Sequence, residues 1–180
     1  MFRKNKEEKS PLIIVELIAL SLLDVIFNRV SVRKYEKKPV PRDVIINILE
    51  AGRRAPSAMN AQPWHFIVVT DEKIKEALSH RRWTGFLKDA AFIIVGCGEK
   101  DKKWSTVDVT IALQNMVLAA EAQGVGSCWI GDFDEAEVKK LLSIPDHLKI
   151  VALVSFGYPA EKPKPRPKKP LEQIVHYNKF

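Results

Sequence analysis

Arg29, Ser31 and Arg33 alternate along the chain directly after a strongly apolar segment, and this spacing is suited to binding an anion. In an extended backbone alternate side chains lie on one face, so the three polar groups point toward one ligand. Guanidinium groups grip phosphate through paired donors, and a hydroxyl adds another donor. Taken alone, the pattern favours a solvated basic turn after a helix. The phosphate interpretation therefore depends on complementary residues elsewhere in the chain.

Two later stretches supply such residues. Residues 55–64, Ala-Pro-Ser-Ala-Met-Asn-Ala-Gln-Pro-Trp, combine small side chains with turn-forming ones. Residues 164–171, Lys-Pro-Arg-Pro-Lys-Lys-Pro-Leu, interleave cations with prolines. Proline removes amide donors and breaks helices, so this run excludes a basic recognition helix. With a net charge of +7, a small phosphate ligand explains the run at least as well as a nucleic-acid backbone.

The length of 180 residues and a hydrophobic content of 46% predict one globular domain with its own core. The apolar run Leu12–Leu23 contains Glu16 and is shorter than the ~20 residues that a membrane-spanning helix needs. Glu16 and the lack of an Ala-x-Ala cleavage site also disfavour a signal peptide. We therefore predict a cytoplasmic protein with no membrane segment, whose first helix is buried against another chain.

The cysteines and histidines show no spacing typical of metal ligands, so no metal is predicted. Cys97 and Cys128 both lie in apolar surroundings, and the sequence contains no Cys-x-x-Cys pair. This pattern predicts two buried thiols in a reducing compartment rather than a disulfide.

Apolar periodicity predicts alternating helices and strands that position these stretches. Helices are expected over 11–28, 41–54, 71–79, 104–123 and 134–142, and strands over 64–70, 90–97, 127–131 and 149–156. Asp71 and Ser105 are expected helix caps, and Gly124 is expected to end the longest helix, which should be buried nearly all round. The alternation is typical of an α+β or α/β sandwich. Residues 1–13 are expected to be a charged extension, and residues 14–180 a single domain.

Four motifs in order resemble the nitroreductase family of FMN-dependent NAD(P)H oxidoreductases. They are the arginine motif, residues 55–64, the buried helix followed by Gly-Val-Gly-Ser-Cys-Trp-Ile-Gly, and the Gly-Tyr-Pro turn with its basic tail. The resemblance implies an α+β fold: an α-β-α sandwich with a mainly antiparallel central sheet flanked by helices. It also implies an intertwined homodimer in which both chains contribute to flavin sites at the interface.

Residues that match the family's phosphate site come from two distant segments. Arg29 and Ser31 match one half, and Arg166 and Lys168 match a second basic pair from the tail. Arg33 matches the cation at the pyrimidine edge of the flavin, where it stabilises negative charge that arrives with hydride. Val30 lies in the same motif, where many members carry a basic residue or a histidine.

Residues that match the ring site come from a loop and a strand end. Pro56, Ser57, Ala58 and Asn60 match the loop that lines the ring, with Asn60 expected from the partner subunit. Ile130 and Gly131 match the backbone contact at flavin N5, where a glycine lets the amide approach. From the residues alone, a plain turn glycine at 131 is an equally good explanation. At Ser57 and Asn60 ordinary turn chemistry is the better explanation without the resemblance.

The resemblance implies a ping-pong enzyme with FMN as cofactor, NAD(P)H as co-substrate, and a nitroaromatic or quinone as small-molecule acceptor. The flavin carries the chemistry, so no side-chain acid or base is expected. Residues 80–89 should shape the substrate entrance. Trp83 and Phe86 could stack on the substrate or fill the dimer interface, and we favour the interface. The alternatives are a reductive dehalogenase, a flavin-fragmenting enzyme of the same superfamily, or a flavin- or nucleic-acid-binding module without turnover. We favour the enzyme with no nucleic-acid partner.

Overall fold

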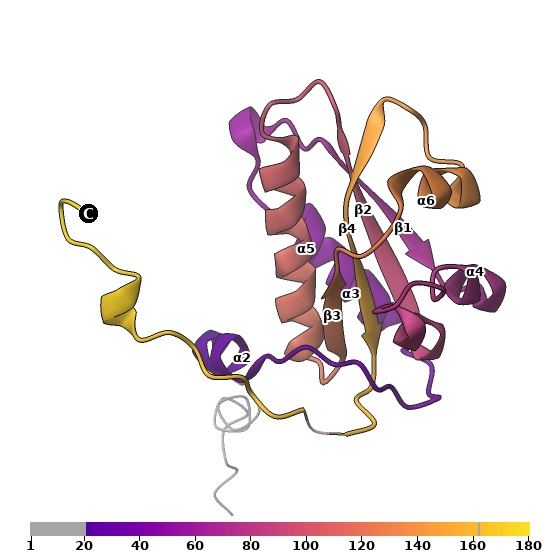
Figure 1. The fold of residues 1–180 in the computed structure, drawn as a ribbon, viewed down its shortest axis with the longest axis horizontal. Helices are drawn as coiled ribbons and strands as arrows, with labels where there is room; N and C mark the ends of the chain where they lie inside the picture. Colours follow the sequence, from indigo (N-terminus) through magenta and orange to yellow (C-terminus); the bar gives the residue numbers. More distant parts are fainter. Residues whose placement is uncertain (1–20, 162) are drawn as a thin grey trace, which may run out of the picture.

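The centre of the molecule is a four-stranded antiparallel sheet with strand order β1-β2-β4-β3 (Figure 1). The computed structural model describes residues 21–161 and 163–180. The strands are β1 (Trp64–Val69), β2 (Phe92–Glu99), β3 (Gly126–Ile130) and β4 (Leu148–Gly157). Each lies within two residues of its predicted range, because runs of branched and aromatic side chains favour a buried strand. The antiparallel α+β architecture is therefore confirmed.

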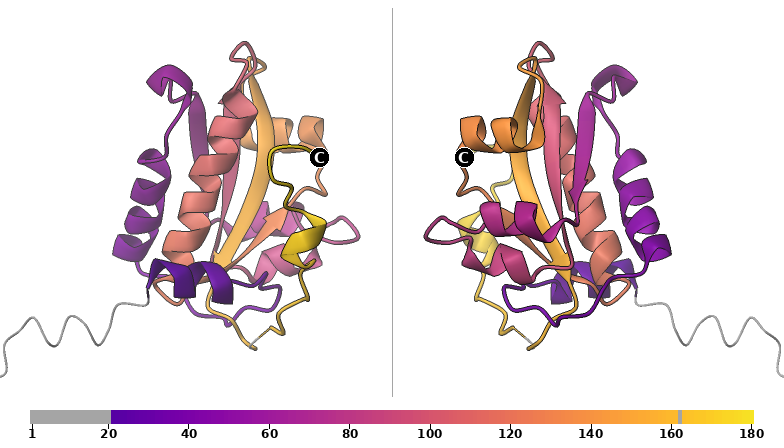
Figure 2. Two further views of the ribbon diagram at one scale, coloured as in Figure 1. Left: turned by 90° about the vertical axis from the view of Figure 1, so that its left-hand side faces the viewer. Right: turned by 90° about the vertical axis from the view of Figure 1, so that its right-hand side faces the viewer.

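Helices cover both faces of the sheet (Figure 2). They are α2 (Leu22–Asn28), α3 (Arg42–Arg53), α4 (Glu72–Ala77), α5 (Ser105–Glu121) and α6 (Glu135–Leu142), with 3-10 turns η1 (Ala58–Asn60), η2 (Gly85–Asp89) and η3 (Leu171–Gln173). On one face α3 and α5 bury a cluster that includes Ile48, Leu113 and Phe156. On the other face α4 and α6 bury a second cluster that includes Leu87 and Val138. The sheet is thus the middle layer of three.

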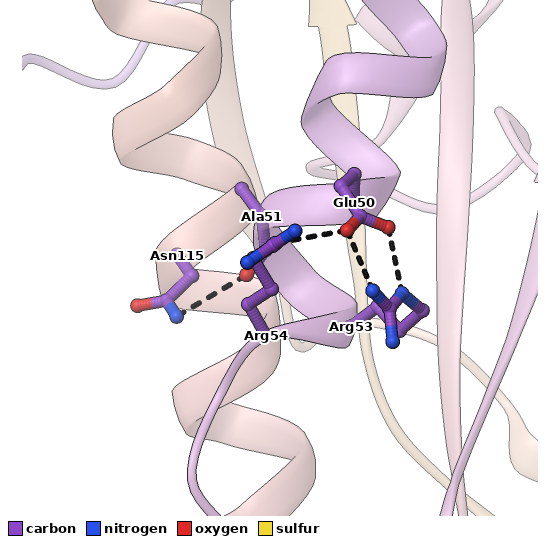
Figure 3. A network of polar contacts seen from close by, with 5 residues as sticks. All are labelled: Glu50, Ala51, Arg53, Arg54 and Asn115. Carbon is purple, nitrogen blue, oxygen red and sulfur yellow. Dashed lines mark hydrogen bonds and ion pairs between the residues drawn. The ribbon is translucent and has the colours of Figure 1, made fainter.

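The contact between α3 and α5 fixes the point where the 56–63 loop begins. Gly52 has no side chain because an added Cβ would lie 2.1 Å from the terminal methyl of Met116. Asn115 on α5 donates from Nδ2 to the carbonyl of Ala51 at 3.3 Å (Figure 3).

Beside it, Glu50 accepts hydrogen bonds from Arg53 at 2.6 Å and Arg54 at 2.8 Å, which lower the pKa of Glu50 to about 2.

The segment that follows α2 is fastened to the sheet by its backbone. Ser31 forms a parallel bridge with Ser127, and the amide of Val32 donates to the Ser127 carbonyl at 2.9 Å. The buried Tyr35 hydroxyl donates to the Val32 carbonyl at 2.9 Å and lies 2.7 Å from the Ser155 hydroxyl. The arginine motif is therefore held in an extended conformation along β3.

Several local predictions need correction. The expected helix over 11–28 is interrupted at Ser21, whose backbone is extended (φ −60°, ψ 151°) and whose side chain caps α2 together with Asp24. Residues 1–20, and with them the predicted extension, lie outside the described residues. Ser105 is not the cap of α5, because Trp104 occupies that position. Phe86 packs against Tyr35 in the core of its own chain, with ring centroids 6.4 Å apart.

Other local predictions are confirmed. The Asp71 side chain accepts the amide hydrogen of Ile74 and so caps α4. Gly124 has a left-handed backbone (φ 73°) after α5. Across the described residues, we find no helix that is both long and apolar enough to cross a membrane.

Candidate functional site

Arg29, Ser31 and Arg33 lie along the segment that the Ser31–Ser127 bridge holds beside β3. Burial raises the pKa of the Cys128 thiol on β3, and three groups oppose this rise: the Arg33 guanidinium, the Ser31 hydroxyl and the Arg29 guanidinium. The intervening Val32 points the other way and is 2% exposed in the core. The alternation expected of an extended chain thus places two cations and a hydroxyl on one side of β3. Val30 is half-buried.

Ile130 and Gly131 lie at the far end of β3. From Ser127, which pairs with Ser31, an extended chain covers about 13 Å to reach Gly131. Ile130 is buried in the core, whereas Gly131 is exposed. A Cβ added at Gly131 would meet no atom within 4 Å, and its φ lies outside the left-handed region. Within the described part of the chain, neither steric crowding nor backbone conformation explains a glycine here. A flat ligand that approaches the backbone closely would explain it.

The loop over residues 57–62 has an unusual backbone. Met59, Asn60 and Gln62 all have positive φ, at 52°, 55° and 48°. Ser57 accepts the Gln62 amide hydrogen at its Oγ, at 3.0 Å, and this bond closes the loop. Such conformations cost non-glycine residues on the order of 1–3 kcal/mol each and gather at functional sites. Pro56, Met59, Asn60 and Gln62 are exposed, and Ser57 and Ala58 are half-buried.

The loop and the arginine motif lie at opposite ends of α5. The amide of Ala58 donates to Asp108 in the first turn of the helix. Arg29 acts on Glu121 at the last turn, where it opposes the rise that burial causes in the pKa of Glu121. These two acids are 13 positions apart, which corresponds to about 20 Å of helix. The structure therefore keeps the loop of one chain apart from the arginine motif of the same chain.

Arg166 and Lys168 lie in a tail that leaves the body of the molecule on the side of α5 (Figure 1). Every residue from 164 to 180 is exposed. Among the described residues, no hydrogen bond or ion pair joins this tail to Arg29, Ser31 or Arg33. The two halves of the predicted phosphate site, Arg29 with Ser31 and Arg166 with Lys168, are thus not brought together within one chain.

Sequence reasoning missed an ion pair next to Gly131. Arg81 donates from Nε to Asp132 at 2.9 Å, which joins the 80–89 region to the residue after Gly131. Beside this pair is a cavity of about 350 Å³ with Ile130, Leu87 and Leu153 among its lining residues. The sequence shows a basic pair, Arg81-Arg82, and an acidic stretch, Asp132-Phe133-Asp134. It does not show that these two stretches meet in the fold.

A larger groove is lined by none of the residues predicted for the flavin. It has a volume of about 1210 Å³ and runs between residues 36–40, α4 and residues 88–91. Its buried Lys75 donates to the Ala90 carbonyl at 2.7 Å and pairs with Glu72 at 2.8 Å. Both partners satisfy the ammonium group within the chain, so this lysine has a structural role.

Comparisons with known proteins identify relatives of this chain. A sequence model described as "Nitroreductase family" matches residues 26–84 and 79–158. An "NADH dehydrogenase" from Thermus thermophilus is 34% identical over 187 residues, covering 82% of this chain and 91% of the relative. An "Iodotyrosine deiodinase" from Thermotoga neapolitana is also 34% identical, over 186 residues, covering 88% of this chain and 98% of the relative. The solved "NADPH:FMN oxidoreductase from Vibrio harveyi complexed with NAD+" superposes with a TM-score of 0.83 at 25% identity, covering 88% of this chain and 77% of that one. The chain belongs to the nitroreductase family.

Proposed function

We propose that this protein is an FMN-dependent oxidoreductase that takes hydride from NAD(P)H and reduces a small acceptor. The observation that carries the proposal is the strip along β3. At its near end the segment with Arg29, Ser31 and Arg33 is bridged to Ser127, and its far end has an exposed glycine that its own chain does not require. Family membership and the activities named for the relatives support the same class of enzyme.

The chain's own residues bind and orient the cofactor. Arg29 and Ser31 would hold the phosphate through charge-assisted hydrogen bonds, and Arg166 and Lys168 would close the clamp from the tail. Arg33 would place a fixed cation near the pyrimidine edge, and the Gly131 amide would contact the ring. When bound, FMN would supply the redox chemistry, which is hydride transfer from NAD(P)H to a nitroaromatic or quinone by a ping-pong mechanism.

The site requires a second copy of the chain. In one protomer, the loop with Ser57, Ala58 and Asn60 lies about 20 Å along α5 from the arginine motif. A homodimer solves this separation if the loop of each chain lines the ring held by its partner. The surface supports such an assembly, because apolar residues of α2, α5 and the tail are exposed: Leu22, Leu23, Phe27, Val107, Leu171, Ile174 and Phe180.

An anaerobic absorption spectrum tests the proposal. Purified protein, loaded with FMN if needed, should show a flavin spectrum that bleaches on addition of NADH or NADPH and returns with a nitroaromatic or quinone. Protein that takes up no FMN would refute the cofactor assignment. A bound flavin that neither nicotinamide bleaches would refute the donor. Salt-dependent binding of nucleic acid without turnover would favour a binding module instead.

A pair of charge-matched variants tests the clamp. Replacing both Arg29 and Arg166 by alanine removes two charge-assisted contacts, so FMN affinity should fall by at least about a hundredfold. The control replaces Arg42 and Lys73 by alanine, because both are exposed and lie outside the strip. This control loses the same charge and should keep the wild-type affinity for FMN. Fluorescence titration of FMN measures both, and equal affinity of the two double variants would refute the clamp.

Reductive dehalogenation is the second candidate, because the deiodinase relative aligns over 98% of its own length. Both activities start from the same bound flavin, so the acceptor half-reaction separates them. Iodide release from 3-iodotyrosine by the pre-reduced protein would favour dehalogenation. Reoxidation by nitroaromatics or quinones without iodide release would favour the first proposal.

A further inference from the structure

The buried carboxylate of Asp108 joins the strained 57–62 loop to α5. Asp108 is 5% exposed and lies in the first turn of the helix. Its Oδ1 accepts the amide hydrogen of Ala58 at 3.2 Å. The two residues are 50 positions apart in sequence, so the bond connects two separate elements.

The ends of the loop are held by other contacts. The amide of Ala55 donates to Gly52 at the end of α3, and the amide of Glu99 donates to the Pro63 carbonyl. Between these ends, the Ser57–Gln62 bond is internal to the loop. Within the described residues, the Asp108 bond is the hydrogen bond from the middle of the loop to the body of the protein.

Three left-handed residues within four positions make this loop costly to maintain. A hydrogen bond to a carboxylate is among the stronger ones in proteins, so it can offset part of this strain. Without the bond, the loop can relax toward ordinary backbone conformations. Those conformations would turn the Ser57, Ala58 and Asn60 groups away from their present directions.

We propose that Asp108 is a positioning residue for flavin binding, which acts by holding the 57–62 loop in its left-handed conformation. This inference rests on the proposed function, because the loop matters only if it lines a flavin. The ordinary alternative is that Asp108 merely stabilises the positive end of the α5 dipole. The two roles differ in what they require, since the dipole needs a negative charge and the loop needs a hydrogen-bond acceptor.

Four variants of the full chain separate these roles. Asp108→Asn keeps an oxygen acceptor and loses the charge, whereas Asp108→Ala loses both. Ala58→Pro removes the donor instead. Proline suits the first position of a helical turn, and the preceding Ser57 is already extended (φ −142°, ψ 156°). Thr110→Ala is the control, because Thr110 is exposed on the same helix and bonds only the Thr106 carbonyl.

The first measurement is amide hydrogen exchange of residues 55–63 in the FMN-free protein, and the second is FMN titration. Wild type, Asp108→Asn and Thr110→Ala should show protected loops and FMN affinities within about threefold of one another. Asp108→Ala and Ala58→Pro should each exchange faster in this segment and bind FMN at least tenfold more weakly. A further variant that combines Asp108→Ala with Ala58→Pro should lose little more FMN affinity than either single variant, because both changes remove the same hydrogen bond.

Three outcomes would overturn the inference. One is wild-type affinity in Asp108→Ala. Another is an equal loss in Asp108→Asn and Asp108→Ala, which would assign the effect to charge. The third is full additivity of Asp108→Ala and Ala58→Pro. Failure of the wild-type protein to bind FMN would instead reject the proposed function, so the two failures are distinguishable.

Discussion

Tyr35 shows how one buried hydroxyl can serve a site that it does not contact. Its oxygen donates to the Val32 carbonyl and accepts from the Ser155 hydroxyl, and the Ser155 oxygen lies 3.4 Å from the Cys128 carbonyl. The network ties the arginine motif, β4 and β3 together. The direction of Arg33 therefore depends on a hydrogen bond formed two residues later in the chain.

Replacing Tyr35 by phenylalanine should lower the free energy of unfolding by about 1–3 kcal/mol at pH 7, since two buried partners lose a bond. Burial raises the pKa of Tyr35 well above its ordinary value. Above pH ~10 the unfolded chain therefore releases the phenol proton while the folded chain retains it, and the wild type loses stability as pH rises. Urea unfolding at pH 7 and pH 11 should show that the difference in unfolding free energy between wild type and Tyr35→Phe is smaller at pH 11. A constant difference would contradict this assignment.

At the scale of elements, β3 and the arginine motif fit together through the absence of one side chain. A Cβ at Gly126 would lie 2.5 Å from Cγ2 of Val32 and 3.0 Å from Cγ of Pro159. Valine is branched at Cβ and has little rotamer freedom, so it cannot swing away. The backbone of the motif lies against the strand because residue 126 is glycine.

Gly126→Ala should push the motif off β3, destabilise the fold by about 1–3 kcal/mol and weaken FMN binding. The second-site change Val32→Ala should restore the affinity by making room. Gly124→Ala is the matched control, because it forces alanine into a left-handed conformation in open space and so costs stability alone. Unfolding curves and FMN titrations check both. Equal affinities in the two glycine variants would rule out this mechanism.

Predictability also differs between elements. The strands and long helices follow apolar periodicity, and so the sequence located them to within a few residues. The break at Ser21 was readable as Ser-x-x-Asp, a capping pattern that the apolar run concealed. Asp108 was not readable, because an acid in a first helical turn is ordinary and its partner is 50 residues away. Contacts that depend on tertiary packing, such as Arg81 with Asp132, leave no periodic pattern.

At the scale of the whole molecule, α5 is not covered all round as its apolar sequence suggested. Val107 is 47% exposed, and Ile111, Gln114 and Leu118 are only half-buried. These positions are three to four residues apart, so they form one stripe along the helix. A second copy packed on this stripe would complete the burial and bring each loop toward the partner's arginine motif.

Mixed dimers test this arrangement. Arg29→Ala should disable the arginine half of each site, and Asn60→Ala the loop half. A dimer that contains one chain of each kind, purified through two different tags, then has one intact site built from the unaltered half of each chain. It should bind close to one FMN per dimer at a concentration where neither parent homodimer binds. If each site came from a single chain, the mixed dimer would bind none.

The tail contains Pro163, Pro165, Pro167 and Pro170 between its basic residues. Proline fixes φ near −65° and favours extended conformations in the residue before it, so a free tail of this composition already samples few shapes. Ordering a flexible residue costs about 1–2 kcal/mol of backbone entropy, and much of that cost is absent here. The tail can therefore carry Arg166 and Lys168 to a phosphate with little loss of freedom, as a stiff spacer rather than a loose tether.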